Sequence, residues 1–206
     1  MKNTVAVVGS RELPAAWSGR VSSVVTQLLQ RGCQIASGGA LGADLFALQA
    51  VVRAGASSGA SVFLPGQSLQ QSPLACQQAL AVFQQAGGTV VPGQAQPGAN
   101  KDEFVAALFA RSVALVQACK GVVAFVSGQA RGTWFTCQQA ARLGRSVVVF
   151  PVAGPSALKS LGCGSWQPVA SWSGAWRWVP SVPLGSRCRH GLSVQSCSGL
   201  PLREPF

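Results

Sequence analysis

Ser37-Gly38-Gly39-Ala40-Leu41-Gly42-Ala43-Asp44 is a glycine-punctuated turn between a short strand-like run at 34–36 and a stretch of helical apolar spacing at 43–54. A second such turn, Ser127-Gly128-Gln129-Ala130-Arg131-Gly132-Thr133, follows the apolar run 122–126. A third, Gly9-Ser10-Arg11, follows the first apolar run of the chain. A small-residue turn between a strand and a helix aims free backbone N–H groups at an anion. Three such turns in one parallel sheet predict a binding site for a phosphate-bearing ligand at its C-terminal edge.

Apolar periodicity extends this unit into a regular alternation of strands and helices. Strands are expected at 5–8, 33–36, 61–64, 89–91, 122–126 and 146–150, and helices at 16–30, 43–54, 73–86, 101–118 and 133–143. Continuous β-branched runs are typical of strands that are buried on both faces. The order predicts an α/β, Rossmann-like, doubly wound and mostly parallel sheet with helices on both faces.

The character of the chain changes after Pro151. Residues 152–206 hold four of the six Trp, three Cys, the only His and many Gly, Ser and Pro. We expect one Rossmann-like domain at 1–151 and a basic, Trp-rich, partly irregular extension at 152–206, with one or two short strands between 165 and 179. The four Trp of this extension form either a core, which we favour, or a platform for nucleobases.

Composition favours a polyanionic partner. The net charge is +11, and residues 131–206 carry eight basic residues against one acidic residue. Such an excess attracts nucleic acid through counterion release, although a basic soluble surface has the same composition. Only five residues are Asp or Glu, which argues against acid–base catalysis. No catalytic residue and no cofactor is therefore predicted.

The cysteines and the apolar runs indicate a compartment and exclude a membrane span. Seven Cys occur without a CxxC pair, and no basic-then-apolar leader or run of membrane-spanning length is present. We expect a cytoplasmic protein with reduced thiols and no membrane partner. Cys163, Cys188, His190 and Cys197 are zinc-ligand types, but their spacing fits no common zinc finger, so no metal is predicted.

The predicted ligand-binding residues all come from the glycine turns or from one helix start. They are Gly9, Ser10, Arg11, Ser37, Gly38, Gly39, Gly42, Asp44, Asn100, Ser127, Gly128, Arg131, Gly132 and Thr133. The glycines would cradle phosphate, or they would form tight turns without a ligand. Asn100 either contacts the ligand or only caps the following helix, and Thr133 either caps its helix or bonds the ligand.

Three charged residues have alternatives of their own. Arg11 clamps a phosphate or forms an ion pair with Glu12 or Asp44. Asp44 contacts a sugar hydroxyl or stabilises the start of its helix. For Arg111, inside the helix expected at 101–118, the alternative to a ligand contact is a solvated surface charge.

The three turns together resemble the SLOG superfamily, which includes the DNA-processing protein DprA (Smf) and the LOG phosphoribohydrolases. The similar segments are the strand and turn at 5–11, the glycine turn at 37–44, and the stretch from Gly132 to Pro151. Leu48 stands where DprA proteins usually have His, as in small uncharacterised SLOG proteins. The helix after Thr133 lacks the carboxylate of the LOG signature.

The resemblance implies a Rossmann-like fold, a nucleotide or nucleic-acid ligand and a homodimer. The leading hypothesis is a DprA-like protein that binds single-stranded DNA in DNA processing or recombination, without catalysis. One alternative is a sensor or carrier of a nucleotide or nucleotide derivative. Another is a LOG-like nucleotide phosphoribohydrolase, in which Asp44, Asp102 or Glu103 would act.

Overall fold

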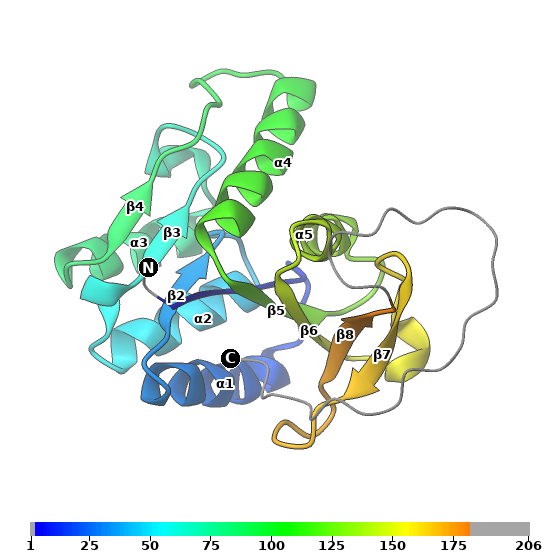
Figure 1. The fold of residues 1–206 in the computed structure, drawn as a ribbon. Helices are drawn as coiled ribbons and strands as arrows, with labels where there is room; N and C mark the ends of the chain where they lie inside the picture. The colour runs from blue at the N-terminus through cyan, green and yellow to red at the C-terminus, as the bar shows by residue number, and fades with distance from the viewer. Residues whose placement is uncertain (1–2, 182–206) are drawn as a thin grey trace.

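The computed structural model of this protein describes residues 3–181. Six strands form the parallel part of one sheet (Figure 1): β1 (Thr4–Gly9), β2 (Gln34–Ser37), β3 (Ser61–Phe63), β4 (Thr89–Val91), β5 (Gly121–Val126) and β6 (Ser146–Pro151). The strand order is β4-β3-β2-β1-β5-β6-β8-β7, and β1 pairs in parallel with both β2 and β5. The order of the chain therefore reverses between β1 and β5, which is the place where open α/β sheets bind ligands.

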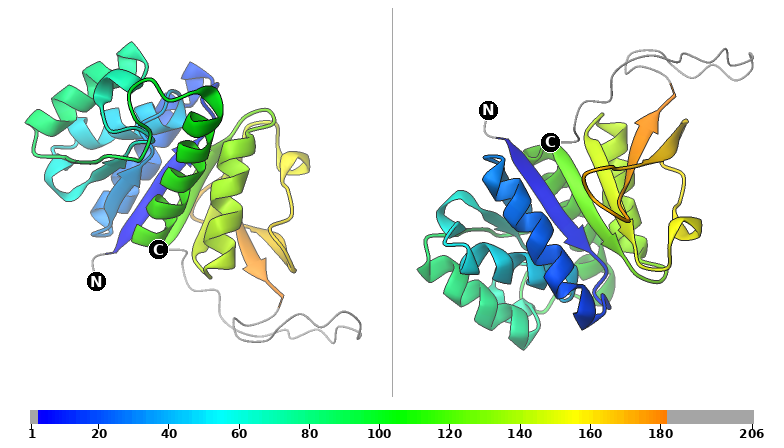
Figure 2. Two further views of the ribbon diagram at one scale, coloured as in Figure 1. Left: turned by 90° about the horizontal axis from the view of Figure 1, so that it is seen from above. Right: turned by 90° about the horizontal axis from the view of Figure 1, so that it is seen from below.

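Helices cover both faces of the sheet, as the sequence predicts (Figure 2). The helices are α1 (Ser18–Gln30), α2 (Ala43–Arg53), α3 (Leu74–Gln85), α4 (Lys101–Ala118) and α5 (Arg131–Arg142). Residues of α1, α2 and α3 pack with Val5 and Val7 of β1, whereas residues of α4 and α5 pack with Ala6 and Val8. Alternate residues of one strand thus face two different cores, which explains the continuous apolar composition of β1.

The Trp-rich segment adds an antiparallel hairpin to the sheet. β8 (Trp176–Pro180) pairs with β6, and β7 (Gly164–Pro168) pairs with β8, so the prediction of strands between 165 and 179 is confirmed. Trp172 is 2% exposed, and its Nε1 donates to Gln27 Oε1 of α1 at 2.8 Å. Trp178 is also buried and lies 5.2 Å from Trp166 between ring centroids. These side chains build the core, which is the interpretation that the sequence favours.

Within the range 3–181, no helix is long and apolar enough to cross a membrane. No group of three or more His, Cys, Asp or Glu that could hold a metal ion occurs in it. Of the four residues considered for zinc, Cys163 is exposed, and the other three lie outside the described residues.

Candidate functional site

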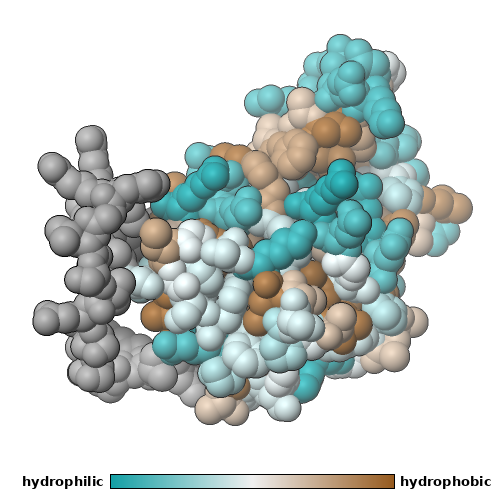
Figure 3. Space-filling view, turned by 90° about the vertical axis from the view of Figure 1, so that its right-hand side faces the viewer, coloured by the Kyte–Doolittle hydropathy of each residue, from teal (hydrophilic) through white to brown (hydrophobic). Residues whose placement is uncertain are grey.

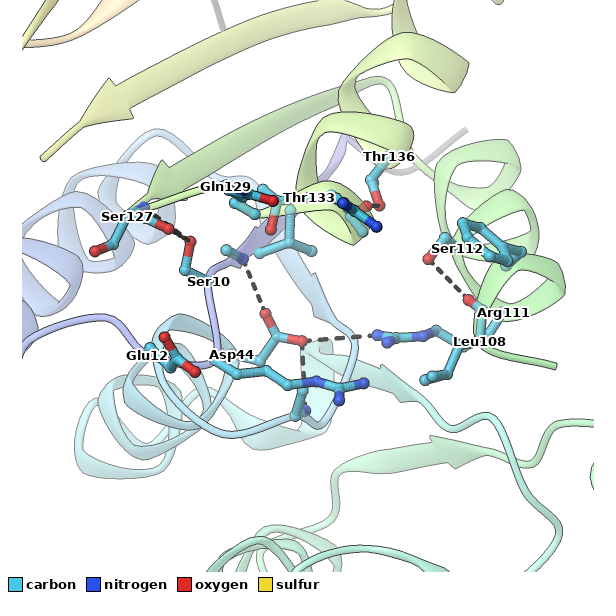
Figure 4. Close-up of a pocket in the computed structure, with 18 of the residues that line it drawn as sticks. Ser10, Glu12, Asp44, Leu108, Arg111, Ser112, Ser127, Gln129, Thr133 and Thr136 are labelled. Atoms are coloured by element: carbon cyan, nitrogen blue, oxygen red, sulfur yellow. Dashed lines mark hydrogen bonds and ion pairs between the residues drawn. The ribbon is translucent and has the colours of Figure 1, made fainter. Parts of the chain in front are cut away.

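A cavity of about 550 Å³, which we name the β1–β5 pocket, opens at the C-terminal ends of β1 and β5 (Figure 4). Its walls come from four segments of the chain: the turn after β1, the turn that leads into α2, the turn that leads into α5, and one side of α4. Nine of the fourteen predicted ligand residues line it: Gly9, Ser10, Arg11, Asp44, Ser127, Gly128, Arg131, Gly132 and Thr133. The fold thus brings residues of all three glycine turns to one cavity, the turn 37–44 through Ala40 and Asp44 alone.

The first turn of α5 presents uncapped backbone N–H groups. Its N-cap residue, Ala130, adopts the left-handed conformation with φ 40°, and no side chain caps the helix. The N–H groups of residues 131, 132 and 133 therefore lack helical partners, and these residues line the pocket. A Cβ built on Gly132 would meet no atom within 4 Å, so the backbone here is open to a ligand. Such a terminus attracts a phosphate through its N–H groups and its dipole.

Ser10 holds the ends of β1 and β5 together. Its Oγ donates to the carbonyl oxygen of Ser127 at 2.9 Å and accepts from the N–H of Ser127 at 2.8 Å. The backbone N–H of Ser10 donates to the Phe125 carbonyl at 2.9 Å. Because the hydroxyl already donates and accepts a hydrogen bond, Ser10 shapes the turn of the pocket and has little capacity left for a ligand.

A buried ion pair forms one end of the β1–β5 pocket (Figure 4). Arg111 Nη1 lies 3.6 Å from Asp44 Oδ2, and the two side chains are 11% and 4% exposed. Asp44 Oδ1 accepts from the N–H of Gly9 at 3.1 Å, and Oδ2 accepts from the N–H of Ala40 at 3.4 Å. Burial raises the pKa of Asp44, and the charge of Arg111 and these N–H groups limit that rise.

The solvated alternative for Arg111 is wrong. The side chain is almost fully enclosed and contributes to the pocket wall, and its Nε has no hydrogen-bond partner among the described residues. Burial lowers the pKa of Arg111, and the carboxylate of Asp44 opposes this effect. The helical pattern held a signal for this position, because residue 111 follows Ala107 by one turn and precedes Leu115 by one turn, and both are buried.

Gly38 and Gly42 lie behind the pocket, where they make room for its parts. A Cβ on Gly38 would overlap Arg111 Nη1 and lie 2.6 Å from Asp44 Oδ2. A Cβ on Gly42, which has φ +72°, would collide with the backbone that follows β1 and lie 2.6 Å from the Arg11 oxygen. These two glycines therefore permit the ion pair and the close approach of two turns.

The remaining predicted ligand residues also lie outside the pocket lining. Ser37 is 2% exposed, and Gly39 has φ +66° and packs near Leu64 and Val62. Asn100 caps α4: its Oδ1 accepts from the Glu103 N–H at 3.0 Å, and Glu103 Oε2 accepts from the Asn100 N–H at 2.9 Å. The side chain of Asn100 thus performs the capping function that the sequence analysis named as its alternative role.

Charged side chains give the pocket a positive balance. Arg11, Arg131 and Arg111 line it against Glu12 and Asp44. Arg11 and Arg131 are exposed, and within residues 3–181 neither forms an ion pair. Since Asp44 is already paired, the open part of the pocket holds two arginines and one acid. The arrangement suits an anionic group.

The carboxylates of the hydrolase hypothesis are not gathered at this site. Asp102 and Glu103 are exposed in the first turn of α4 and do not line the pocket. Asp44 lines the pocket but is committed to Arg111 and two backbone N–H groups.

Comparisons with known proteins agree with this architecture. The family model for DNA recombination-mediator protein A matches residues 1–167. None of the curated proteins matches the chain. Among solved structures, DNA processing protein A (DprA) from Streptococcus pneumoniae is 24% identical, with a TM-score of 0.58, over 78% of this chain and 54% of that one.

The DprA structure from Helicobacter pylori, which was described for its single-stranded DNA binding mode, is 19% identical. Its TM-score is 0.57, over 71% of this chain and 64% of that one. This chain thus spans about half to two thirds of the length of these relatives. At such identities the likeness shows a shared fold, whereas the family model covers most of the sequence. The resemblance that the sequence carries is confirmed, and the chain belongs to the DNA recombination-mediator protein A (DprA) family.

Proposed function

We propose that this chain is a DprA-like DNA-processing protein that binds single-stranded DNA through its phosphates at the β1–β5 pocket. The observation that carries the proposal is the uncapped start of α5, which lines one cavity together with exposed Arg11 and Arg131. Backbone N–H groups at a helix start and arginine side chains are the groups that hold phosphate oxygens in proteins. A single strand supplies a phosphate at every nucleotide.

The charge of the whole chain supports this partner. A net charge of +11 on 206 residues favours binding to a polyanion of any nucleotide sequence, because binding releases condensed counterions. The family assignment and the single-stranded DNA binding described for the Helicobacter pylori relative point to the same class of ligand. Neither depends on the geometry of the pocket, so they support the proposal independently.

The test is a titration of fluorescein-labelled oligothymidylate, followed by anisotropy at several salt concentrations. The affinity of wild type is expected to fall as the salt concentration rises. Arg131→Ala is expected to weaken binding. It should also reduce the salt slope, which is the slope of log K against log salt concentration, by about 0.7, the value for one lost phosphate contact on a single strand. Arg142→Ala is the matched control, since Arg142 is an exposed arginine at the other end of the same helix and does not line the pocket.

Two results would contradict the proposal. One is the absence of binding at low salt. The other is an equal loss of affinity in Arg131→Ala and Arg142→Ala, because that would place the attraction in overall charge and not in the pocket.

The size of the pocket favours a second candidate, a sensor or carrier of a free nucleotide. Its volume of about 550 Å³ lies within the range of roughly 300–1,000 Å³ that is typical of sites for single small molecules. Calorimetry with thymidine monophosphate tests this function. Saturable binding with one ligand per chain, with no tighter binding by the oligonucleotide, would favour the carrier over the strand-binding protein.

A further inference from the structure

A long uncharged segment of the sequence forms one end of the sheet. The 47 residues 54–100 contain no Asp, Glu, Lys, Arg or His, whereas the whole chain has a net charge of +11. Even at the chain's own content of 10% charged residues, a segment of this length would hold about five. The segment builds β3, α3 and β4, which lie at the end of the sheet opposite to β7 (Figure 1). This end of the molecule therefore has a surface almost without charge.

The opposite end of the molecule has a different surface. On the side of β7 and β8, hydrophilic side chains are interspersed among hydrophobic ones (Figure 3). Residues 132–181, which include this side, hold four basic residues and no acidic one. Two copies of the chain that met through this side would bring like charges together, which costs free energy. Two uncharged ends can meet without this repulsion.

Helix α3 exposes apolar side chains at the uncharged end. Leu74 and Val82 are 67% and 50% exposed, and they are two of the five exposed large apolar residues within residues 3–181. The other exposed side chains of α3 are those of Ala and Gln. A surface helix ordinarily has charged residues on its outer face. The outer face of α3 is therefore suited to contact with another protein surface.

A groove of about 480 Å³, which we name the α2–α3 groove, lies beside these side chains. Ala75, Ala79 and Val82 form its wall on α3, and the two alanines leave room for the backbone of another helix. Leu48 and Val52, one turn apart, form its wall on α2. A groove with apolar residues at such helical spacing accepts one face of a helix.

The groove has one charged residue, and that residue is engaged. Arg53 lines the groove, but its Nη2 donates to Ser22 Oγ of α1 at 2.8 Å. The polar side chains of α3 are glutamines, whose amides both donate and accept hydrogen bonds. An identical set of amides can pair with them, whereas a strongly charged partner would find no complement here.

These features make the surface complementary to itself. Val82 and the neighbouring Leu74 protrude beside a groove that has room for apolar side chains. A two-fold contact between identical chains requires this combination, because each copy must offer both the protruding part and the groove that receives it. A second copy of this chain meets the requirement with α3 alone.

We propose that a second copy of this chain docks on the α2–α3 groove, with α3 of each copy in the groove of the other. The uncharged end of the molecule is thus the interface of a homodimer. The family resemblance implies a dimer but does not assign its surface. The inference does not depend on the proposed function, because the α2–α3 groove and the β1–β5 pocket share no lining residue.

The experiment is sedimentation equilibrium of the full chain over a series from low to high micromolar concentration, at low and at high salt. Four proteins are compared: wild type, Val82→Glu, Val82→Gln and Leu143→Glu. Leu143 is the matched control because it is 46% exposed, follows α5 and does not line the groove. Far-ultraviolet circular dichroism checks that each variant is folded.

Wild type is expected to reach twice the 21.1-kDa mass of one chain. Val82→Glu is expected to raise the dissociation constant of the dimer at least about tenfold, because each copy would bury an unpaired carboxylate. Val82→Gln is expected to raise it less, since the new side chain stays uncharged, and Leu143→Glu is expected to associate as wild type does. Salt is expected to leave the wild-type dimer unchanged or to strengthen it, because salt screens the repulsion between two copies of charge +11.

A wild type that stays monomeric at the highest concentration would overturn the inference and leave the groove to a helix of another protein or to residues 182–206 of the same chain. An unchanged dissociation constant in Val82→Glu would also overturn it. Loss of the dimer in Leu143→Glu alone would place the interface beside α5, against the inference. So would a dimer that weakens as salt rises, because opposite charges would then hold the two copies together.

Discussion

Breaking the buried ion pair between Asp44 and Arg111 is expected to destabilise the protein strongly. In Asp44→Asn the new side chain keeps its size, but the guanidinium 3.6 Å away remains enclosed at 11% exposure without a counter-charge. Coulomb's law gives about 4–5 kcal/mol for such a pair at an effective dielectric constant of about 20. Removing one partner of a buried pair is known to cost about 3–5 kcal/mol. We therefore expect Asp44→Asn and Arg111→Met each to lose about 3–5 kcal/mol of unfolding free energy.

A double-mutant cycle separates the pair from the individual side chains. The double variant Asp44→Asn/Arg111→Met leaves no buried charge, so we expect its loss to be smaller than the sum of the single losses by at least about 2 kcal/mol. The assay is urea unfolding followed by tryptophan fluorescence. The slope of the unfolding free energy against urea concentration is expected to be the same in all variants. Arg142→Met, at an exposed position, is expected to stay within about 0.5 kcal/mol of wild type. Additive single losses, within about 0.5 kcal/mol, would refute the reasoning.

The glycine turn before α2 and the buried thiols can be tested in the same way. The methyl group of Gly38→Ala is expected to displace Arg111 from Asp44. The variant should then lose nearly as much unfolding free energy in urea as Asp44→Asn or Arg111→Met. Wild-type stability in Gly38→Ala would show that the guanidinium has room to move. Burial raises the pKa of Cys119 and of Cys137 to about 12. After iodoacetamide treatment at pH 8.5, peptide mass mapping should therefore find both thiols unmodified in the folded protein and modified after unfolding. Rapid modification in the folded state would contradict this burial.

Much of the fold could be predicted because its signals are local. The strand β5 is buried at every position, and the runs that form it and β1 stand out in the sequence as continuous apolar segments. The glycine turn before α5 was identified as a strand-to-helix connection, although the helix begins at Arg131 and not at 133. That shift matters, because it places the free N–H groups of residues 131–133 in the pocket.

The candidate site was predicted in part, because residue type does not tell which side of a turn meets the cavity. Gly38 and Gly132 look alike in sequence. In the structure, a Cβ on Gly38 would enter the ion pair, whereas one on Gly132 would meet only open space. The position of Asn100 before α4 leaves two roles open, a ligand contact or a helix cap, and in the structure its side chain is engaged with Glu103 in the cap.

The sequence by itself determined the order of strands and helices, the three turns, the basic charge and the family, because each of these depends on neighbouring residues or on composition. Only the tertiary structure decided which groups meet. Asp44 and Arg111 are 67 positions apart in the sequence, and they meet because the start of α2 and one side of α4 both reach the pocket at the ends of β1 and β5. The same packing brings exposed Phe109 of α4 and the start of α5 to one cavity. Proximity between distant segments is a property of the packed chain, and no local pattern encodes it.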